Sequence, residues 1–294
     1  MFLLTYYYDN RESVGFLNEE KTGIIPAEKV LSLNSNSNMI DLIELFNTID
    51  LEKLKEKISL YRDEIKIAEA KILSPIPYPK RNVLCLGKNY LDHIHEVKSL
   101  KNVNADIPEK PIYFSKIAYP TIGHKDFIDS HSHIVKELDY EVELAVIIGK
   151  KCKNLSPLET EDYIFGYTIS NDISARDVQT SHVQWHKGKS FDTFCPLGPY
   201  IAYKSNFNFP PKLNIKSYVN GELRQNGNTK DLIFDIPTII SDITSAITLY
   251  PGDIILTGTP AGVGAGFEPP KHLNSGDRID CLIEGIGTLS NTVK

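Results

Sequence analysis

The sequence lacks the features that mark membrane, secreted and nucleic-acid-binding proteins. No apolar run approaches the roughly 18 residues of a membrane-spanning helix, and Leu144–Ile148 is typical of the longest runs present. The opening residues Met1–Tyr8 have no basic segment and no small-residue cleavage site, which argues against a signal peptide. The chain has 32 basic and 38 acidic residues, a net charge of −6, and no block of lysine and arginine. We therefore expect a soluble, cytoplasmic protein that binds neither membranes nor nucleic acid.

Cysteine is also scarce. The four cysteines are scattered along the chain without a CxxC pair, at Cys85, Cys152, Cys195 and Cys281. This spacing excludes a zinc ribbon and a dense disulfide framework. Because their neighbours are apolar, we predict buried, reduced thiols.

What the chain does have is apolar material for a large core: 41% of its 294 residues are hydrophobic, and this length predicts about two domains. Residues 1–72 are predicted to form a small α+β domain, with a polar loop and nothing more at Asn34–Asn38. Its predicted strands are Phe2–Tyr8, Val14–Leu17 and Gly23–Ile25, and its predicted helices are Met39–Phe46 and Thr48–Ile58. Three prolines between Ser74 and Pro79 then predict an extended connector over residues 73–81.

Residues 82–294 have a different pattern, in which short β-type runs alternate with turn residues. The predicted strands are Asn82–Leu86, Pro111–Phe114, Tyr140–Ile148, Tyr163–Asn171, Leu213–Val219, Asp253–Leu256 and Arg278–Ile283. Asn220-Gly221 is a typical hairpin turn, and long helical periodicities are rare. The pattern therefore predicts an α+β, β-dominated second domain rather than an alternating βαβ fold.

Two glutamates stand out in the predicted strand Tyr140–Ile148. Side chains alternate along a strand, so Glu141 and Glu143 share one face while Val142 and Leu144 share the other. Two neighbouring carboxylates repel each other and lose hydration if they are buried. Solvent, a basic partner or a divalent cation would each offset that cost, and the pattern alone leaves the three open.

Asp172 adds a third carboxylate, just after the predicted strand Tyr163–Asn171. Three carboxylates without a cysteine or histidine cluster favour Mg²⁺ or Mn²⁺ over zinc. Arg176 and Gln179 are three residues apart and would share a face of one helical turn. A salt bridge from Arg176 to Asp172 or Asp177 is an equally open reading.

Histidines offer a candidate general base. His93 and Glu96 are three residues apart, so a helical turn would pair them as a base and its orienting carboxylate. Asp92 and His95 have the same spacing, and spacing alone cannot separate the two pairs. His131 and His133 have metal-like spacing but no third partner, so we expect no ligand role there.

A glycine-rich loop at Leu256–Gly264 superficially resembles a dinucleotide-binding motif. The following Ala265–Pro270 segment ends in two prolines and cannot form the helix that such a motif needs. We expect the glycines to let the backbone approach a small anionic ligand closely.

Together, these segments resemble the fumarylacetoacetate hydrolase superfamily over about residues 76–294, in particular its bacterial acylpyruvate hydrolase, oxaloacetate decarboxylase and 2-hydroxyhepta-2,4-diene-1,7-dioate isomerase group. Five motifs carry the resemblance in order: G-x-N-Y-x-x-H-x-x-E from Gly87, Y-E-x-E from Tyr140, N-D-x-S-A-R-D-x-Q from Asn171, K-S-F-D from Lys189 and L-T-G-T-P-x-G-V-G from Leu256.

The resemblance implies a mixed β-roll, in a homodimer, around a site for Mg²⁺ or Mn²⁺. It implies that the metal ligands are Glu141, Glu143 and Asp172, that the catalytic residues are His93, Glu96 and Lys189, and that the substrate-binding residues are Arg176, Gln179 and Thr259. The resemblance favours the pair His93 and Glu96 over the pair Asp92 and His95. It also implies a mobile lid over Asp92–Ala105, and it puts Lys88 and Lys116 near the rim of the pocket.

The activity that the resemblance implies is the Mg²⁺-dependent cleavage of a carbon–carbon bond in a small 2,4-dioxo acid of the acylpyruvate or fumarylpyruvate type, through a metal-bound pyruvate enolate. Decarboxylation of oxaloacetate or isomerisation of an unsaturated 2-oxo diacid reaches a similar enolate and is the alternative. An alternative of another class is a catalytically silent metal-binding fold that acts through a protein partner.

Overall fold

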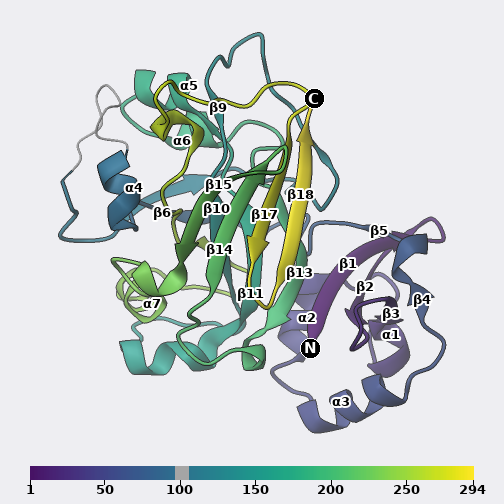
Figure 1. The fold of residues 1–294 in the computed structure, drawn as a ribbon. Helices are drawn as coiled ribbons and strands as arrows, with labels where there is room; N and C mark the ends of the chain where they lie inside the picture. Colours follow the sequence, from purple (N-terminus) through teal and green to yellow (C-terminus); the bar gives the residue numbers. More distant parts are fainter. Residues whose placement is uncertain (97–105) are drawn as a thin grey trace.

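The computed structural model describes residues 1–96 and 106–294, and its largest sheet has eleven strands. Ten of them follow the order β4-β3-β2-β1-β13-β11-β10-β16-β6-β7, and β5 pairs with β1. These strands are β1 (Phe2–Tyr8), β2 (Arg11–Leu17), β3 (Gly23–Pro26), β4 (Ile65–Lys66), β5 (Lys71–Ile72), β6 (Val83–Gly87), β7 (Ile112–Lys116), β10 (Val142–Ile148), β11 (Ile164–Asn171), β13 (Leu197–Tyr203) and β16 (Ile254–Leu256). Figure 1 shows β1–β5 to one side of the remaining strands.

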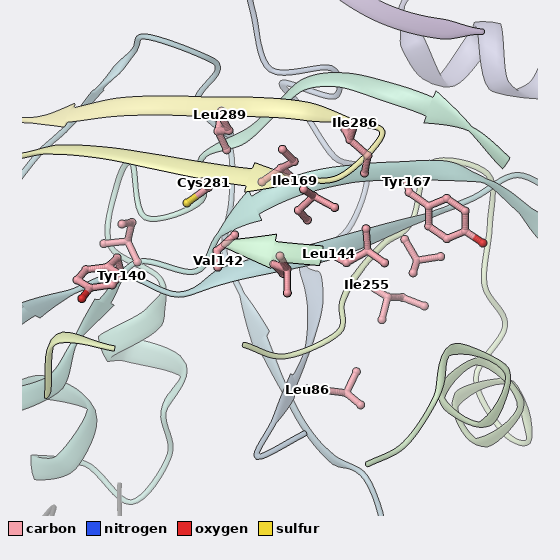
Figure 2. Close-up of a cluster of buried hydrophobic side chains, with 14 of the residues drawn as sticks. Leu86, Tyr140, Val142, Leu144, Tyr167, Ile169, Ile255, Cys281, Ile286 and Leu289 are labelled. Atoms are coloured by element: carbon pink, nitrogen blue, oxygen red, sulfur yellow. The ribbon is translucent and has the colours of Figure 1, made fainter. Parts of the chain in front are cut away.

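A second sheet of five strands packs against the β10–β11 part of the first. Its order is β15 (Glu222–Asn228), β14 (Asn214–Val219), β17 (Arg278–Ile283), β18 (Gly287–Val293) and β8 (Phe127–Ile128). Figure 2 shows the core between them, where Val142, Leu144 and Ile169 of the first sheet lie near Cys281 and Leu289 of the second. Two short strands, β9 (Leu138–Asp139) and β12 (Ser174–Ala175), pair with each other.

The helices are short. They are α1 (Ala27–Val30), α2 (Met39–Leu45), α3 (Leu51–Leu60), α4 (Leu91–Glu96), α5 (Arg176–Ser181), α6 (His186–Lys189) and α7 (Ile236–Thr244). There are also 3₁₀ turns at η1 (Ile67–Glu69), η3 (Pro157–Tyr163), η4 (Lys204–Asn206), η5 (Thr229–Asp231) and η6 (Gly264–Gly266). None of the helices in the described ranges is long and apolar enough to cross a membrane. Most pairs of strands are antiparallel, but β16–β6 and β18–β8 are parallel. The predicted α+β, β-dominated class is therefore confirmed.

The polar loop before α2 does more than the sequence analysis predicted. The side chain of Asn38 accepts hydrogen bonds from the backbone N–H groups of Ile40 and Asp41, and the Asp41 side chain accepts one from the Asn38 N–H. This reciprocal cap satisfies N–H groups that the first helical turn leaves without a partner. Asp50 caps α3 in a similar way, so this helix begins at Leu51 rather than at Thr48. The ends of both helices are thus set by caps rather than by the apolar pattern.

The first residues of the chain join the sheet of the later residues through β1. Leu3 of β1 lies opposite Ile201 of β13, a strand that the sequence analysis missed. The missed strand contains Pro199, and proline normally argues against an internal strand. Here the β11–β13 ladder shifts register between Tyr167 and Ile169, and this irregularity accommodates the proline. The predicted boundaries of 1–72, 73–81 and 82–294 stay a prediction, but one sheet extends across them.

An aromatic contact offers a test of how strongly the first segment is attached. The Phe46 ring lies 5.0 Å from the Phe165 ring and 5.5 Å from the Tyr203 ring, and its residue is buried. We expect Phe46→Ala to lower the free energy of unfolding by about 3–5 kcal/mol, because it leaves a cavity between the two segments. Leu60→Ala in the exposed end of α3 is the control and should cost below about 0.5 kcal/mol. Equal denaturation midpoints for the two variants would contradict the prediction.

Candidate metal centre and active site

Three acidic side chains converge at one end of the β10–β11 pair. Glu143 lies in β10, Glu141 directly precedes it, and Asp172 directly follows β11. The strands are antiparallel with Val142 opposite Asn171, so the start of one meets the end of the other. One carboxylate oxygen of each acidic residue lies within 4.8 Å of the others, and the three residues are at most 5% exposed. The structure thus brings the predicted trio together, and it excludes solvent as the group that offsets the charge of the two glutamates.

Buried cations neutralise two of these carboxylates. The Lys189 Nζ lies 2.8 Å from Glu141 Oε2 and 2.7 Å from Asp172 Oδ2. The Arg176 Nη2 lies 2.6 Å from Glu141 Oε1. Burial alone would raise the pKa of Glu141, but Lys189 and Arg176 outweigh it and hold that pKa well below its ordinary value. Glu141 and Asp172 also raise the pKa of Lys189 against the effect of its burial, so the lysine stays charged.

Lys116 does not lie at the rim of the pocket, where the sequence analysis placed it. It is fully buried at the end of β7, forms an ion pair with Asp172 and donates a hydrogen bond to the Ile173 carbonyl at 3.0 Å. A strand pattern shows which face a side chain is on, but not that a long lysine reaches a carboxylate 56 residues away. Lys116 is thus a missed member of the site, and Lys88 is the one that lines the cavity.

Glu143 is the carboxylate without a cationic partner. Within residues 1–96 and 106–294, no ion pair is formed by Glu143, and its Oε2 accepts a hydrogen bond from the Gly258 N–H at 2.6 Å. Burial raises the pKa of Glu143 well above its ordinary value, and the Asp172 and Glu141 charges raise it further. A buried all-oxygen set with one uncompensated carboxylate suits a hard divalent cation such as Mg²⁺ or Mn²⁺.

The raised pKa of Glu143 predicts that cation binding releases a proton. Without the cation, the folded chain keeps this proton at pH values where the unfolded chain has lost it, so the metal-free fold loses stability as pH rises above the ordinary glutamate pKa. Because the cation needs the deprotonated form, its affinity should weaken as pH falls. Calorimetric titration with Mn²⁺ in buffers of different ionisation enthalpy measures the released proton. An apparent enthalpy that is the same in all buffers would contradict the prediction.

The predicted base and its carboxylate are paired on α4. The His93 Nδ1 lies 3.4 Å from Glu96 Oε2, and the other Glu96 oxygen accepts a hydrogen bond from the Gly262 N–H at 2.7 Å. His93 is buried and lines the cavity, while Asp92 and His95 are exposed. The geometry therefore supports His93 and Glu96 over the alternative pair. Of the predicted lid, residues 97–105 lie outside the described residues.

Arg176 and Gln179 lie on one turn of α5, as their spacing predicted. The Arg176 Nη1 donates to Gln179 Oε1 at 3.0 Å, and its Nε donates to Asp139 Oδ2 at 2.9 Å. The alternative salt bridge from Arg176 to Asp172 or Asp177 is not formed in the described residues, where Arg176 pairs with Asp139 and Glu141 instead. Because the Gln179 oxygen accepts from Arg176, the amide nitrogen is the end of this side chain that can donate a hydrogen bond to a substrate oxygen.

Thr259 is held by Gln225, which the sequence analysis did not single out. The Thr259 hydroxyl donates to the Val142 carbonyl at 2.9 Å and accepts from the Gln225 Nε2 at 2.7 Å. The buried Gln225 amide is fixed in turn, since its oxygen accepts from the Val142 N–H and the Ser217 hydroxyl. The hydroxyl proton of Thr259 is therefore already in use, and this side chain would have to turn to donate to a substrate carboxylate.

The glycine-rich loop binds the protein's own carboxylates. Its backbone N–H groups donate to Glu143 from Gly258, to Glu96 from Gly262 and to Asp139 from Gly264. From the sequence, these glycines were expected to approach a small anionic ligand. They do approach anions, but in the described residues these are three side chains of the site.

These groups surround a cavity of about 400 Å³. Its lining includes the apolar side chains of Leu86, Phe114 and Trp185. Its charged and polar lining includes His93, Glu141, Arg176, Gln179, Lys189 and Thr259. The His131 and His133 rings lie elsewhere, and His131 packs against Phe191 and Phe194 instead. Each cysteine is buried and free, as predicted.

Comparison with known proteins shows relatives along the whole chain. The model of the fumarylacetoacetate (FAA) hydrolase C-terminal family matches residues 82–294. The oxaloacetate tautomerase YisK of Bacillus subtilis (strain 168) is 50% identical over 227 residues, which are 77% of this chain and 74% of the relative.

Solved structures give the same result for the fold. A fumarylacetoacetate hydrolase (EaFAH) from psychrophilic Exiguobacterium antarcticum has a TM-score of 0.84 at 37% identity, and the match covers 100% of this chain and 99% of that one. The maleylpyruvate hydrolase from Sphingobium sp. SYK-6, solved in complex with manganese (II) ion and pyruvate, has a TM-score of 0.80 at 29% identity and covers 100% and 98%. The predicted fold type is thus confirmed, and the chain belongs to the fumarylacetoacetate (FAA) hydrolase family.

Proposed function

We propose that this protein is an enzyme that interconverts the keto and enol forms of oxaloacetate with the help of Mg²⁺ or Mn²⁺. The observation that carries the proposal is the convergence of Glu141, Glu143 and Asp172 next to the charged Lys189 and next to a cavity that also contains His93. The name of the 50% identical relative, an oxaloacetate tautomerase, supports this choice of reaction. Carbon–carbon hydrolysis, the first choice from the sequence alone, is the second candidate.

The reaction must stabilise negative charge on the oxygen at C2 of the substrate while a proton leaves C3. Glu141, Glu143 and Asp172 would hold a divalent cation, which would supply Lewis acidity to the substrate when bound. Lys189 supplies a fixed donor, because two of its three N–H groups serve Glu141 and Asp172 in the described residues. Its ammonium also lies 5.2 Å from the centre of the Phe114 ring, and we assign its third N–H to a substrate oxygen. Since the pKa of Lys189 is raised, the side chain acts as a charged donor and not as the base.

His93 is then the group that exchanges a proton with C3. Glu96 contacts its Nδ1, which leaves Nε2 as the nitrogen that takes and returns the proton. For the keto form, the C3–H bond breaks, the proton goes to His93, and the oxygen at C2 gains a proton from solvent or from the same base. Glu96 stabilises the imidazolium that forms, and the Gly262 N–H holds Glu96 in place.

Two residues of α5 that line the cavity, Arg176 and Gln179, would hold the carboxylates of the substrate. The guanidinium of Arg176 is fixed by three acceptors and stays charged, because Glu141 and Asp139 raise its pKa against the effect of burial. The amide nitrogen of Gln179 is turned away from Arg176 and can donate. For Thr259, the geometry favours a supporting role through Val142 over direct donation to a carboxylate.

Carbon–carbon hydrolysis of an acylpyruvate-type acid is the second candidate, and the His93–Glu96 pair favours it. The same base that removes a proton from C3 can remove one from a water molecule that attacks the C4 carbonyl. One of the similar structures is named a maleylpyruvate hydrolase. Isomerisation of an unsaturated 2-oxo diacid, decarboxylation of oxaloacetate and the silent metal-binding fold stay predictions from the sequence, and so does the homodimer.

One assay series separates these reactions. The metal-free full-length protein is mixed with oxaloacetate, with and without Mg²⁺ or Mn²⁺. Ultraviolet absorbance follows the enol and nuclear magnetic resonance follows pyruvate, while a parallel series uses acetylpyruvate. We expect faster loss of the enol than the spontaneous rate, dependent on the cation and without pyruvate formation. Acceleration with no added cation would contradict the metal site, and cleavage of acetylpyruvate without tautomerisation would establish the second candidate instead.

A further inference from the structure

Asp139 is a buried carboxylate that belongs to neither the predicted metal ligands nor the predicted substrate contacts. It ends β9, is fully buried, and both of its oxygens are occupied. Oδ1 accepts hydrogen bonds from the N–H groups of Tyr140 at 2.9 Å and Gly264 at 2.6 Å. Oδ2 accepts them from the Ala265 N–H at 3.0 Å and from the Arg176 Nε at 2.9 Å. One side chain thus ties a loop to the guanidinium that lines the cavity.

The same loop also holds the catalytic base. Three residues before Ala265, the Gly262 N–H donates to Glu96, the partner of His93. The loop packs so closely that a Cβ atom at Gly264 would overlap the Lys271 carbonyl oxygen and the Asp139 carboxylate, and one at Gly266 would overlap the Glu96 carboxyl group. The glycines at these positions are therefore needed for the contacts with the two carboxylates.

We propose that Asp139 and residues 262–266, which we call the carboxylate bracket, are a positioning device that fixes Arg176 relative to the His93–Glu96 pair. This inference rests on the proposed function, because it assigns the geometry of that same site. The bracket connects two parts of the site that lie on different elements: α4 carries the base, and α5 carries Arg176 (Figure 1). A shift of about 1 Å between such groups can cost about 100-fold in rate.

The bracket also explains why the Arg176 guanidinium divides its contacts between Asp139 and Glu141. Arg176 has three acceptors, and Asp139 takes its Nε while Glu141 Oε1 takes its Nη2. Without the Asp139 charge, Glu141 would be the one carboxylate paired with the guanidinium in the described residues, and the neutral Gln179 oxygen would be its other partner. The guanidinium would then lose one of the contacts that fix its position relative to the His93–Glu96 pair.

The test is a double-mutant cycle with Asp139→Asn and Glu96→Gln, read as kcat for oxaloacetate with Mn²⁺. We expect Asp139→Asn to lower kcat by about 10- to 100-fold. In the double variant, the combined loss should fall short of the product of the single losses by about 5-fold or more. The control is Asp253→Asn, since Asp253 is also a buried acid with an arginine partner, Arg81, and a backbone N–H donor, from Tyr250. It should reduce stability, leave kcat within about 2-fold, and combine multiplicatively with Glu96→Gln.

Two results would overturn the bracket: an Asp139→Asn kcat equal to that of the wild type, or single losses that multiply in the double variant. If Asp139→Asn does not fold, Gly264→Ala takes its place in the cycle. If the wild type turns over neither oxaloacetate nor acetylpyruvate, the proposed function fails separately. The bracket is then judged by the binding of oxalate with Mn²⁺, followed by fluorescence of Trp185, the single tryptophan. Asp139→Asn must weaken that binding at least threefold and Asp253→Asn must not, or the bracket is rejected.

Discussion

Glu143→Gln and Asp172→Asn should both abolish cation-dependent tautomerisation, but they should change the stability of the metal-free protein in opposite directions. Each variant removes one of the three charged oxygen ligands, so we expect Mn²⁺ affinity to fall by more than about 100-fold. This loss exceeds the one that is typical when the replaced residue only hydrogen-bonds to a metal ligand. The rate should fall by about 10²- to 10⁴-fold, the equivalent of several kcal/mol of lost charge stabilisation.

The stability effects differ because the two carboxylates differ in their partners. Glu143 has no cationic partner in the described chain, and its raised pKa favours the protonated form that glutamine imitates. Glu143→Gln should therefore leave the metal-free protein as stable as the wild type or more so. Asp172 pairs with both Lys116 and Lys189, so Asp172→Asn leaves two buried lysines poorly compensated and should cost about 3–5 kcal/mol.

Thermal denaturation of each protein without metal, repeated with Mn²⁺ at a concentration that saturates the wild type, measures both effects. Added Mn²⁺ should stabilise the wild type and neither variant. Asp162→Asn, at an exposed position before the start of β11 and so at the opposite end of that strand from Asp172, is the control and should behave as the wild type does. Equal destabilisation of the metal-free protein by both substitutions would show that Glu143 is charged and paired in solution, against the geometry described here.

The convergence of the three carboxylates could be predicted, and its physical basis is simple. Glu141 and Glu143 lie at the start of a buried strand, and Asp172 follows the end of another. Any antiparallel pairing of neighbouring strands that places Val142 opposite Asn171 brings them together. The motifs selected these residues from among the many acidic side chains of the chain. The pairing itself came only with the structure.

The supporting residues could not be predicted, because their partners are far away in the sequence. Lys116 forms an ion pair with Asp172, and Gln225 donates a hydrogen bond to Thr259. Asp139 accepts hydrogen bonds from backbone N–H groups of a loop about 125 residues later. Periodicity reports the burial of a residue, not which buried polar group it meets. A general signal was available for Lys116 and Asp139, because each is a charged residue at the end of a strand and a buried polar group needs a partner. Gln225 gave no such signal, because most of the residues in its strand are polar.

Some local features could have been found from the sequence. Asn38 and Asp41 have the three-residue spacing of a capping box, and they set the start of α2. Helix α7 was missed although Asp235 caps it and Pro237 lies in its first turn, a typical helix start. Its run of isoleucine and threonine, which are common in strands, concealed that signal.

Lys189→Met should separate the electrostatic role of this lysine from the role of the cation. The lysine is buried, and its ammonium bridges Glu141 and Asp172. Methionine has a similar length and no charge, so the two carboxylates would lose a shared partner. In the metal-free protein, we expect this to cost about 3–5 kcal/mol of stability, the range for breaking a buried ion pair. A bound cation would supply positive charge to the same carboxylates, so Mn²⁺ should restore most of this stability.

The rate should not recover with the stability. The third N–H of Lys189 is the donor that we assign to the substrate oxygen, and loss of such a donor costs about 10²- to 10³-fold in kcat. Lys189→Arg keeps the charge but not the compact ammonium, so it should restore the stability without the full rate. Lys187→Met, at an exposed position of the same helix, is the matched control and should change neither quantity. If the Lys189→Met protein saturated with Mn²⁺ kept kcat within about 10-fold of the wild type, Lys189 would be a structural counter-charge, and the donor to the substrate oxygen would have to be another cavity residue.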